Sequence, residues 1–153
     1  MSAADRLEPP LDMLAAWHRL GEDQFETLWR LARRMPLTTV DVAACEAADA
    51  VIFYFDKSVA VHHPDEELDL FPALIESMAG SDPVCLREMI DELTHEHRAL
   101  ASTWQRLRPA FAELAAAVPA TIESEDIEEL IARCERLFRL EGRSTSDSRS
   151  RSR

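Results

Sequence analysis

The sequence predicts an all-α protein, an up-down antiparallel four-helix bundle. Alanine, leucine, glutamate and arginine are the most frequent of its 153 residues, and these residue types favour helices. Only three glycines are present, too few for a turn-rich β architecture. Four long apolar patterns of helical period are separated by short breaks, which is typical of bundles whose consecutive helices run antiparallel.

The first two helices are bounded by proline and threonine. The first is expected over residues 11–35. Pro9 and Pro10, just before this range, suit the start of a helix, and Pro36 stops the apolar pattern at its end. The second is expected over about residues 40–78, with Thr38 or Thr39 as the N-terminal cap.

The third and fourth helices follow clear breaks. The stretch AGSDP, residues 79–83, is the clearest turn: its glycine can end the second helix, and Ser81 or Asp82 can cap a third helix over about residues 84–118. A fourth helix begins after Pro119 and carries acidic residues in its first turns, where the helix dipole favours them.

The chain divides into three parts. Residues 1–9 are expected to be a flexible lead-in, and residues 10–142 to form the bundle, with a shortened fourth helix that ends near Gly142. Residues 143–153, RSTSDSRSRSR, contain no apolar side chain and are expected to be disordered.

Charge and cysteine content exclude several classes of protein. A net charge of −12 would repel the phosphate backbone of a nucleic acid. No apolar run approaches the ~18 residues that would predict a membrane span, and the N-terminus has no apolar signal core. Cys45, Cys85 and Cys134 are odd in number and widely spaced, which is no disulfide framework. These features predict a cytoplasmic protein.

A polar side chain interrupts the apolar seam of the first, third and fourth helices. Steps of three and four residues place His18, His97 and Glu141 among large apolar residues. A lone histidine on an apolar face is more often a hydrogen-bonded core residue. Here, however, all four helices contribute, and a buried imidazole or carboxylate is costly unless it is paired or binds metal. His95 lies off the seam, which indicates a surface position.

The second helix contributes through VHHPDEELDLFP, residues 61–72. Either His62 with Glu66 or His63 with Glu67 fits the seam, and the spacing alone does not choose between them. Either pair could hold one ion from one face of a helix. Three imidazoles with carboxylates suit non-haem iron, with manganese or zinc as lesser alternatives, and bundles build such sites from facing helices.

Three stretches, WHRLGEDQFETL, YFDKSVAVHHPDEELDLFP and LTHEHRALASTWQRLRPAF, resemble the hemerythrin-like, HHE cation-binding domains of bacteria, from about Leu11 to Leu140. The resemblance implies a bundle that holds non-haem iron, usually two ions, and that binds oxygen or responds to oxygen, nitric oxide or redox state. It implies four ligands: His18, His62, Glu66 and His97. His63 and Glu67 would then support the ligands or face solvent.

Two departures from the family pattern affect this expectation. Pro64 can kink the second helix and rotate His63 inward, so the alternative pair stays open. On the fourth helix, Glu141 stands where the family has a histidine, and Thr145 where it has a glutamate. The expected site is therefore three histidines with Glu66 and Glu141, for one ion or a weakly held pair. A shortened fourth helix would also expose apolar surface and favour self-association.

The leading hypothesis is a metal-binding domain without enzymatic activity, with a metal ion and O2 or NO as partners. The alternative is a metal-poor helical module for interaction or regulation, and metal content discriminates between the two. A diiron oxidase or peroxidase ranks last, because the one Glu-x-x-His motif, Glu92 with His95, lies off the apolar seam.

Overall fold

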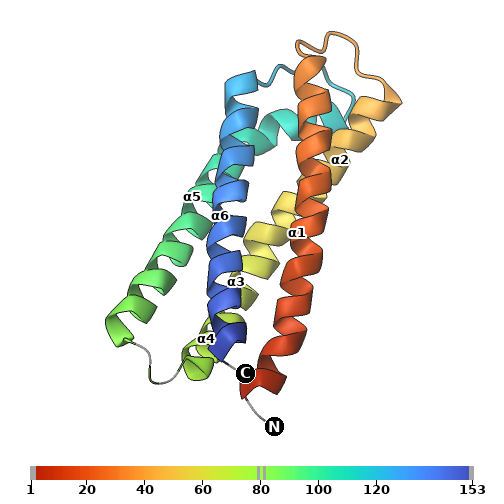
Figure 1. Ribbon diagram of the computed structural model, residues 1–153. Helices are drawn as coiled ribbons and strands as arrows, with labels where there is room; N and C mark the ends of the chain where they lie inside the picture. The colour runs from red at the N-terminus through yellow and green to blue at the C-terminus, as the bar shows by residue number, and fades with distance from the viewer. Residues whose placement is uncertain (1–2, 79, 81, 152–153) are drawn as a thin grey trace.

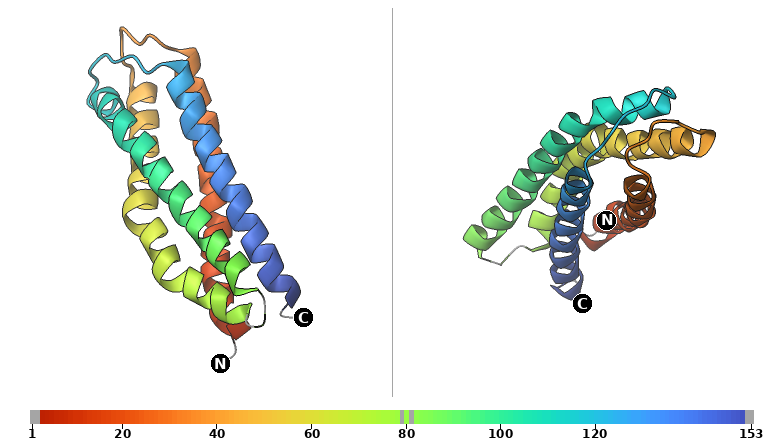
Figure 2. Two further views of the ribbon diagram at one scale, coloured as in Figure 1. Left: turned by 90° about the vertical axis from the view of Figure 1, so that its left-hand side faces the viewer. Right: turned by 90° about the horizontal axis from the view of Figure 1, so that it is seen from above.

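The computed structural model describes the backbone of residues 3–78, 80 and 82–151, and the side chains of residues 11–78, 80 and 82–143. Four helical rods run up and down side by side (Figure 1). They are α1 (Ala3–Arg33), a composite second rod, α5 (Pro83–Ala115) and α6 (Ser124–Arg151). Because α1 packs on α2 and α6, and α5 packs on the same two elements, the rods close into a ring around one core (Figure 2). The predicted all-α bundle is confirmed.

The second rod is continuous but changes its winding twice. It consists of α2 (Val42–Lys57), a π-helical segment η1 (Ser58–His62), α3 (His63–Asp65), a second π-helical segment η2 (Glu66–Leu70) and α4 (Phe71–Ser77). Each π-helical segment ends just before a proline, Pro64 or Pro72. A proline lacks the N–H for the regular hydrogen bond and crowds the preceding turn, and a wider turn relieves both problems.

The helix caps agree with the sequence at one end of the bundle and differ at the other. Asp82 accepts a hydrogen bond from the backbone N–H of Val84 at 2.9 Å, as one of the two expected caps of the third helix. The second rod is capped by Asp41 rather than by either expected threonine, and its carboxylate accepts from Ala44 N–H at 2.8 Å. Arg34 also binds Asp41, at 2.7 Å, so one carboxylate caps a helix and fixes the preceding loop.

Large apolar side chains fill the upper half of the bundle. Phe55, Trp104 and Phe111 are fully buried. Phe55 stacks on Trp104 with ring centroids 5.0 Å apart, and Phe111 packs against Trp104 at a tilt with centroids 5.6 Å apart. The indole N–H of Trp104 donates to Asp56 at 2.9 Å, and Arg108 binds the same carboxylate. The polar atom of the largest core residue is therefore satisfied, as burial requires.

Both outer helices are longer than the sequence predicted. The backbone of α1 is already helical at Ala3, within the expected lead-in, and α6 continues past Gly142 to Arg151. Gly142 has no positive φ that would end the helix, and serine and arginine are acceptable in the interior of a helix. The described backbone of α6 thus runs past the expected end near Gly142. The side chains of residues 144–153 lie outside the described residues, and the disorder of this tail stays a prediction.

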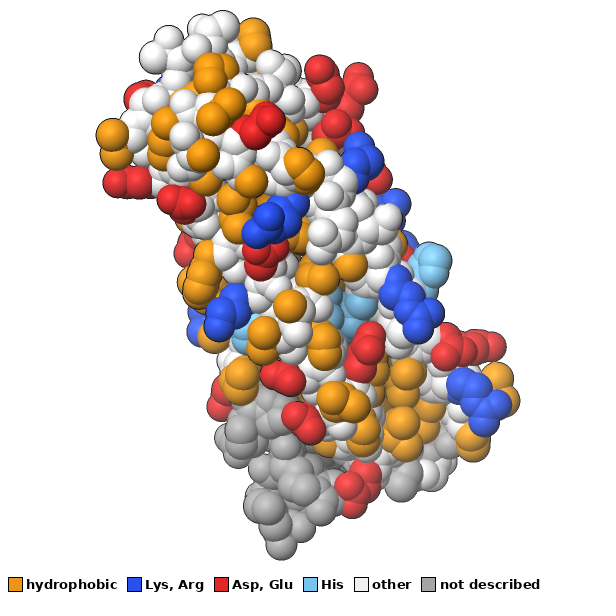
Figure 3. Space-filling model, turned by 180° about the vertical axis from the view of Figure 1, so that it is seen from behind, with side chains coloured by type: hydrophobic (Ala, Val, Ile, Leu, Met, Phe, Trp, Pro, Cys, Tyr) orange, Lys and Arg blue, Asp and Glu red, His pale blue; other side chains and the backbone are white. Residues whose placement is uncertain are grey.

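Among the side chains that the structure describes, the large exposed hydrophobic ones lie outside α6. Phe53 is 61% exposed and Leu68 is 74% exposed, both on the outside of the second rod. Figure 3 shows hydrophobic, acidic and basic side chains interspersed on the face opposite that of Figure 1. Self-association through an incomplete fourth helix stays a prediction, and the described backbone of α6 continues to Arg151.

Candidate metal centre

Three ligand-type side chains converge in the lower half of the bundle, each from a different rod. Glu66 comes from η2, His97 from α5 and Glu141 from α6, and each offers a ligand atom within 4.8 Å of the others. His97 and Glu141 are each only 3% exposed, and the side chain of Glu66 is 12% exposed. Among the described residues, no other group of three histidine, cysteine or acidic side chains meets this geometry.

Both ring nitrogens of His97 face carboxylates. Its Nε2 lies 3.0 Å from Glu66 Oε2 and 3.3 Å from Glu141 Oε1. Its Nδ1 lies 3.1 Å from Glu67 Oε1, so Glu67 orients the imidazole from the rim. The sequence predicted the inward position of His97 correctly, since its apolar neighbours on the α5 seam, Leu93 and Leu100, are also buried.

His18 reaches the cluster from α1 through Glu141. Its Nε2 lies 2.5 Å from Glu141 Oε2, a short and charge-assisted contact. The ring of His18 stacks on Phe138 of α6 with centroids 4.1 Å apart. Glu141 is thus held by two histidines from two helices.

The second rod turns His63 inward and His62 outward, a different pairing from either one left open by periodicity. His63 is 7% exposed and its ring lies parallel to that of His97, with centroids 4.0 Å apart. His62 instead stacks on Trp17 at 3.8 Å, outside the cluster. The structure therefore combines His63 with Glu66, because the π-helical segments on either side of Pro64 break the regular seam.

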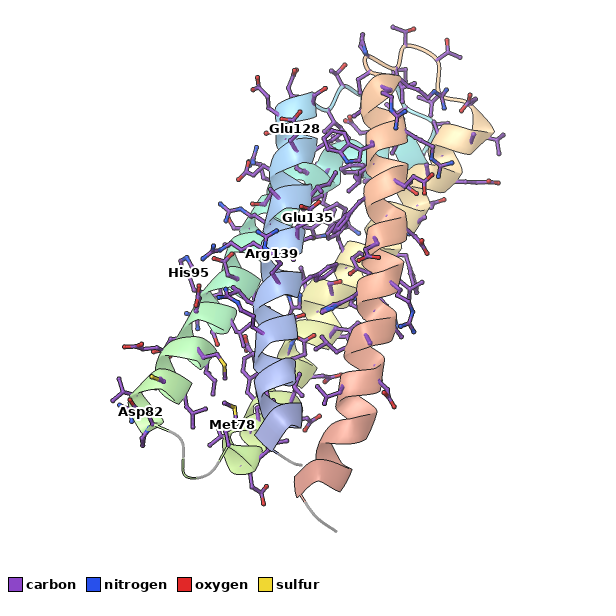
Figure 4. The ribbon with its side chains drawn as sticks, viewed as in Figure 1. Met78, Asp82, His95, Glu128, Glu135 and Arg139 are labelled. Carbon is purple, nitrogen blue, oxygen red and sulfur yellow. The ribbon has the colours of Figure 1, made fainter. Side chains whose placement is uncertain are left out.

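Two surrounding features were not apparent from the sequence. Trp17 donates from its indole N–H to Ser58 at 2.8 Å and stacks on Tyr54 at 4.7 Å, which fixes the wall beside the cluster. No spacing rule connects these residues, because they meet only through the packing of α1 on the second rod. His95 is exposed and points away from the bundle on α5 (Figure 4), as the sequence predicted.

Burial and close charges perturb the ionisation of the whole cluster. Burial, together with the charge of the neighbouring Glu141, raises the pKa of Glu66 to about 8. Burial alone would lower the pKa of His97, but its bonds to Glu141 and Glu66 outweigh this and raise it to about 10. Burial would raise the pKa of Glu141, yet the hydrogen bonds from His18 and His97 hold it below its usual range.

His63 remains neutral beside these charges. Burial, together with the positive charge of His97, lowers the pKa of His63 to about 3. A buried imidazole that is neutral at pH 7 has a free lone pair, which is the form that binds metal.

The donor set fits a cation. Glu66 Oε2 is buried, and within the described residues it has no hydrogen-bond partner apart from its 3.0 Å ionic contact with His97 Nε2. The Nε2 of His97 carries at most one proton, although two carboxylate oxygens approach it. The cluster thus holds more acceptors than donors and retains protons to balance its charge, and a divalent cation would supply that balance instead.

No helix in the described part of the chain is long and apolar enough to cross a membrane.

Comparison with known proteins agrees with this geometry. The family model described as Hemerythrin HHE cation binding domain matches residues 10–141, which include every member of the cluster. An uncharacterized protein of Haemophilus influenzae is 28% identical over 132 residues, which cover 86% of this chain and 74% of that protein. No solved structure matches the chain significantly. Because the family model spans most of the sequence, the chain belongs to the hemerythrin HHE family of cation-binding helical domains.

Proposed function

We propose that this domain holds non-haem iron between its helices and serves oxygen binding or the sensing of oxygen, nitric oxide or redox state. The observation that carries the proposal is the buried, acceptor-rich cluster of Glu66, His97 and Glu141. Histidine with carboxylate ligands suits iron, with manganese or zinc as weaker alternatives. Ferrous iron, when bound, supplies an affinity for small diatomic ligands and a one-electron redox couple.

The residues around the ligands have separable roles. Glu66, His97 and Glu141 would bind the ion, and His63 offers a neutral imidazole next to His97. His18 holds Glu141 in place through its 2.5 Å contact. The family resemblance implied His62 as a ligand; in this proposal His62 instead forms part of the wall beside the cluster, because its ring stacks on Trp17.

One ion for each chain suits the cluster better than a pair. Three ligand atoms within 4.8 Å of one another can surround a single cation. Glu141 occupies the position of a family histidine, and its second oxygen is already bound to His18.

We place the protein in a reducing, cytoplasmic compartment, because all three cysteines are free.

Anaerobic reconstitution tests the oxygen-related function. The purified chain would be loaded with ferrous iron without oxygen, cleared of free metal, and titrated with O2 and then NO while its absorption spectrum is recorded. The proposal predicts saturable spectral changes that depend on bound iron. An iron-loaded protein whose absorption spectrum changes with neither O2 nor NO would refute the proposed oxygen or nitric oxide function. A chain that takes up no iron would instead support the alternative of a metal-poor interaction module.

A further inference from the structure

A separate pocket lies between α1 and the irregular part of the second rod, next to the metal cluster. Its volume is about 200 Å³. One wall is apolar and consists of Met13, Leu14 and Trp17 from α1, with Leu70 from η2. An apolar cavity of roughly 150 Å³ admits a benzene-sized molecule, so this pocket has room for a small organic ligand.

The apolar wall is held rigidly. The indole N–H of Trp17 is already bound to Ser58 at 2.8 Å, so the tryptophan has no polar atom left to offer a ligand. Its ring is fixed between Tyr54, at 4.7 Å, and His62, at 3.8 Å. Leu14 and Leu70 are buried, which ties the floor of the pocket to the core. A preformed wall reduces the ordering cost of binding.

The second rod also contributes acidic side chains to the lining of the pocket. Asp65, Glu66 and Asp69 line the pocket, and its described lining contains no lysine or arginine. Asp65 and Asp69 are exposed and lie outside the metal cluster, whereas Glu66 stands between the pocket and the cluster. The pocket therefore combines an apolar floor with negative charge at its rim, and the net charge of −12 also attracts cations.

We propose that this pocket binds a small organic cation with an apolar body, of about the size of benzylammonium. The apolar body would lie against Met13, Leu14 and Trp17, and the ammonium group would face Asp65 and Asp69. An anion of the same size would meet repulsion at the rim, and a neutral molecule would keep only the apolar contact. The inference does not depend on iron, because neither aspartate belongs to the cluster.

Three probes of one shape separate charge from size: benzylammonium, benzyl alcohol and benzoate at pH 7. Their dissociation constants would be measured by ligand-observed NMR on the full chain, both as purified and after metal removal. The proposal predicts that benzylammonium binds at least about threefold more tightly than benzyl alcohol and that benzoate binds most weakly, in both preparations. Equal affinity for the three probes, or tighter binding of benzoate, would overturn it.

Charge reversal locates the site. Asp69→Lys should weaken benzylammonium binding by about three- to tenfold and leave benzyl alcohol nearly unaffected, because an exposed charge pair contributes modestly. Asp91→Lys makes the same change at an exposed position on α5 and should alter the affinity less than twofold. Asp65→Lys provides an independent second variant, and circular dichroism would verify that all variants remain helical. Equal weakening by Asp69→Lys and Asp91→Lys would show that overall charge, not this pocket, binds the cation.

Discussion

Gly21→Ala and Gly142→Ala make the same chemical change in two helices, and the structure predicts opposite effects on stability. A Cβ at Gly21 would lie 2.5 Å from Tyr54 Oη and 2.6 Å from Phe138 Cζ, well inside contact distance. A Cβ at Gly142 would meet nothing within 4 Å. Gly21 therefore permits a close approach of α1 to its neighbours, whereas an alanine at position 142 would fit without any steric clash.

The magnitudes follow from two opposing contributions. Alanine in place of glycine inside a helix stabilises by about 0.8–1 kcal/mol, and overpacking a well-packed interface costs about 1–3 kcal/mol. Tyr54 is 4% exposed and its hydroxyl donates to the Trp17 carbonyl, so it has little freedom to move away. We therefore expect Gly21→Ala to lower the free energy of unfolding by about 1 kcal/mol, and Gly142→Ala to raise it by up to ~1 kcal/mol.

Urea unfolding of the metal-free chain, followed by circular dichroism, measures both effects. The midpoint should fall for Gly21→Ala and rise for Gly142→Ala, with similar slopes. Adding Phe138→Leu to Gly21→Ala should show favourable coupling of at least about 0.5 kcal/mol, because the smaller side chain makes room. A Gly21→Ala chain more stable than the wild type would refute the close packing, and a destabilised Gly142→Ala chain would show that α6 ends at that glycine.

Three further results are expected. His63→Ala should reduce iron affinity by about tenfold or more, while His95→Ala should change it little. Competition with a chelator measures both affinities, and an equal loss of iron affinity in the two variants would contradict the inward position of His63. Metal affinity should rise between pH 6 and 9, because Glu66 and His97, with pKa values of about 8 and 10, must both lose protons to bind the ion. Calorimetry in buffers of different ionisation enthalpy measures the protons released on metal binding. Metal binding without proton release would contradict the prediction. Asp56→Ala should destabilise by about 1–3 kcal/mol in urea unfolding, because it leaves the buried Trp104 N–H without its acceptor, so an unchanged midpoint would contradict that role. The hydrogen bonds from Arg108 and Trp104 lower the pKa of Asp56, so the stabilising effect of the Asp56 carboxylate is present above about pH 4 and is lost as that carboxylate protonates below it.

Helical periodicity predicted the fold and most of the cluster, because both depend on regular geometry. His97 lies on an uninterrupted α5, so steps of three and four residues place it inward correctly. The same steps fail on the second rod, where two π-helical segments shift the residues around Pro64. Pro64 and Pro72 were visible in the sequence, but a proline can kink, end or widen a helix, and packing decides among these outcomes.

The end of α6 shows a different limit. Composition predicted disorder after Gly142, because serine and arginine bury nothing. The backbone nevertheless remains helical, since nothing there stops a helix already nucleated over the residues from Ser124 onward. The anchoring of Glu141 by His18, 123 residues away in the chain, is a tertiary contact that no local pattern could reveal.

The central claim is that Glu141 helps to hold a metal ion, and metal stoichiometry in one matched pair of variants tests it most directly. Glu141→Gln removes a buried carboxylate of the cluster, and Glu135→Gln makes the same change at an exposed position of α6 that is not part of the cluster. Elemental analysis after anaerobic reconstitution and desalting should find about one iron per chain in the wild type and in Glu135→Gln. With affinity reduced by at least about tenfold, Glu141→Gln should retain only a small fraction of that iron. Equal iron in all three chains would contradict the proposed site, and so would a wild-type chain that retains none.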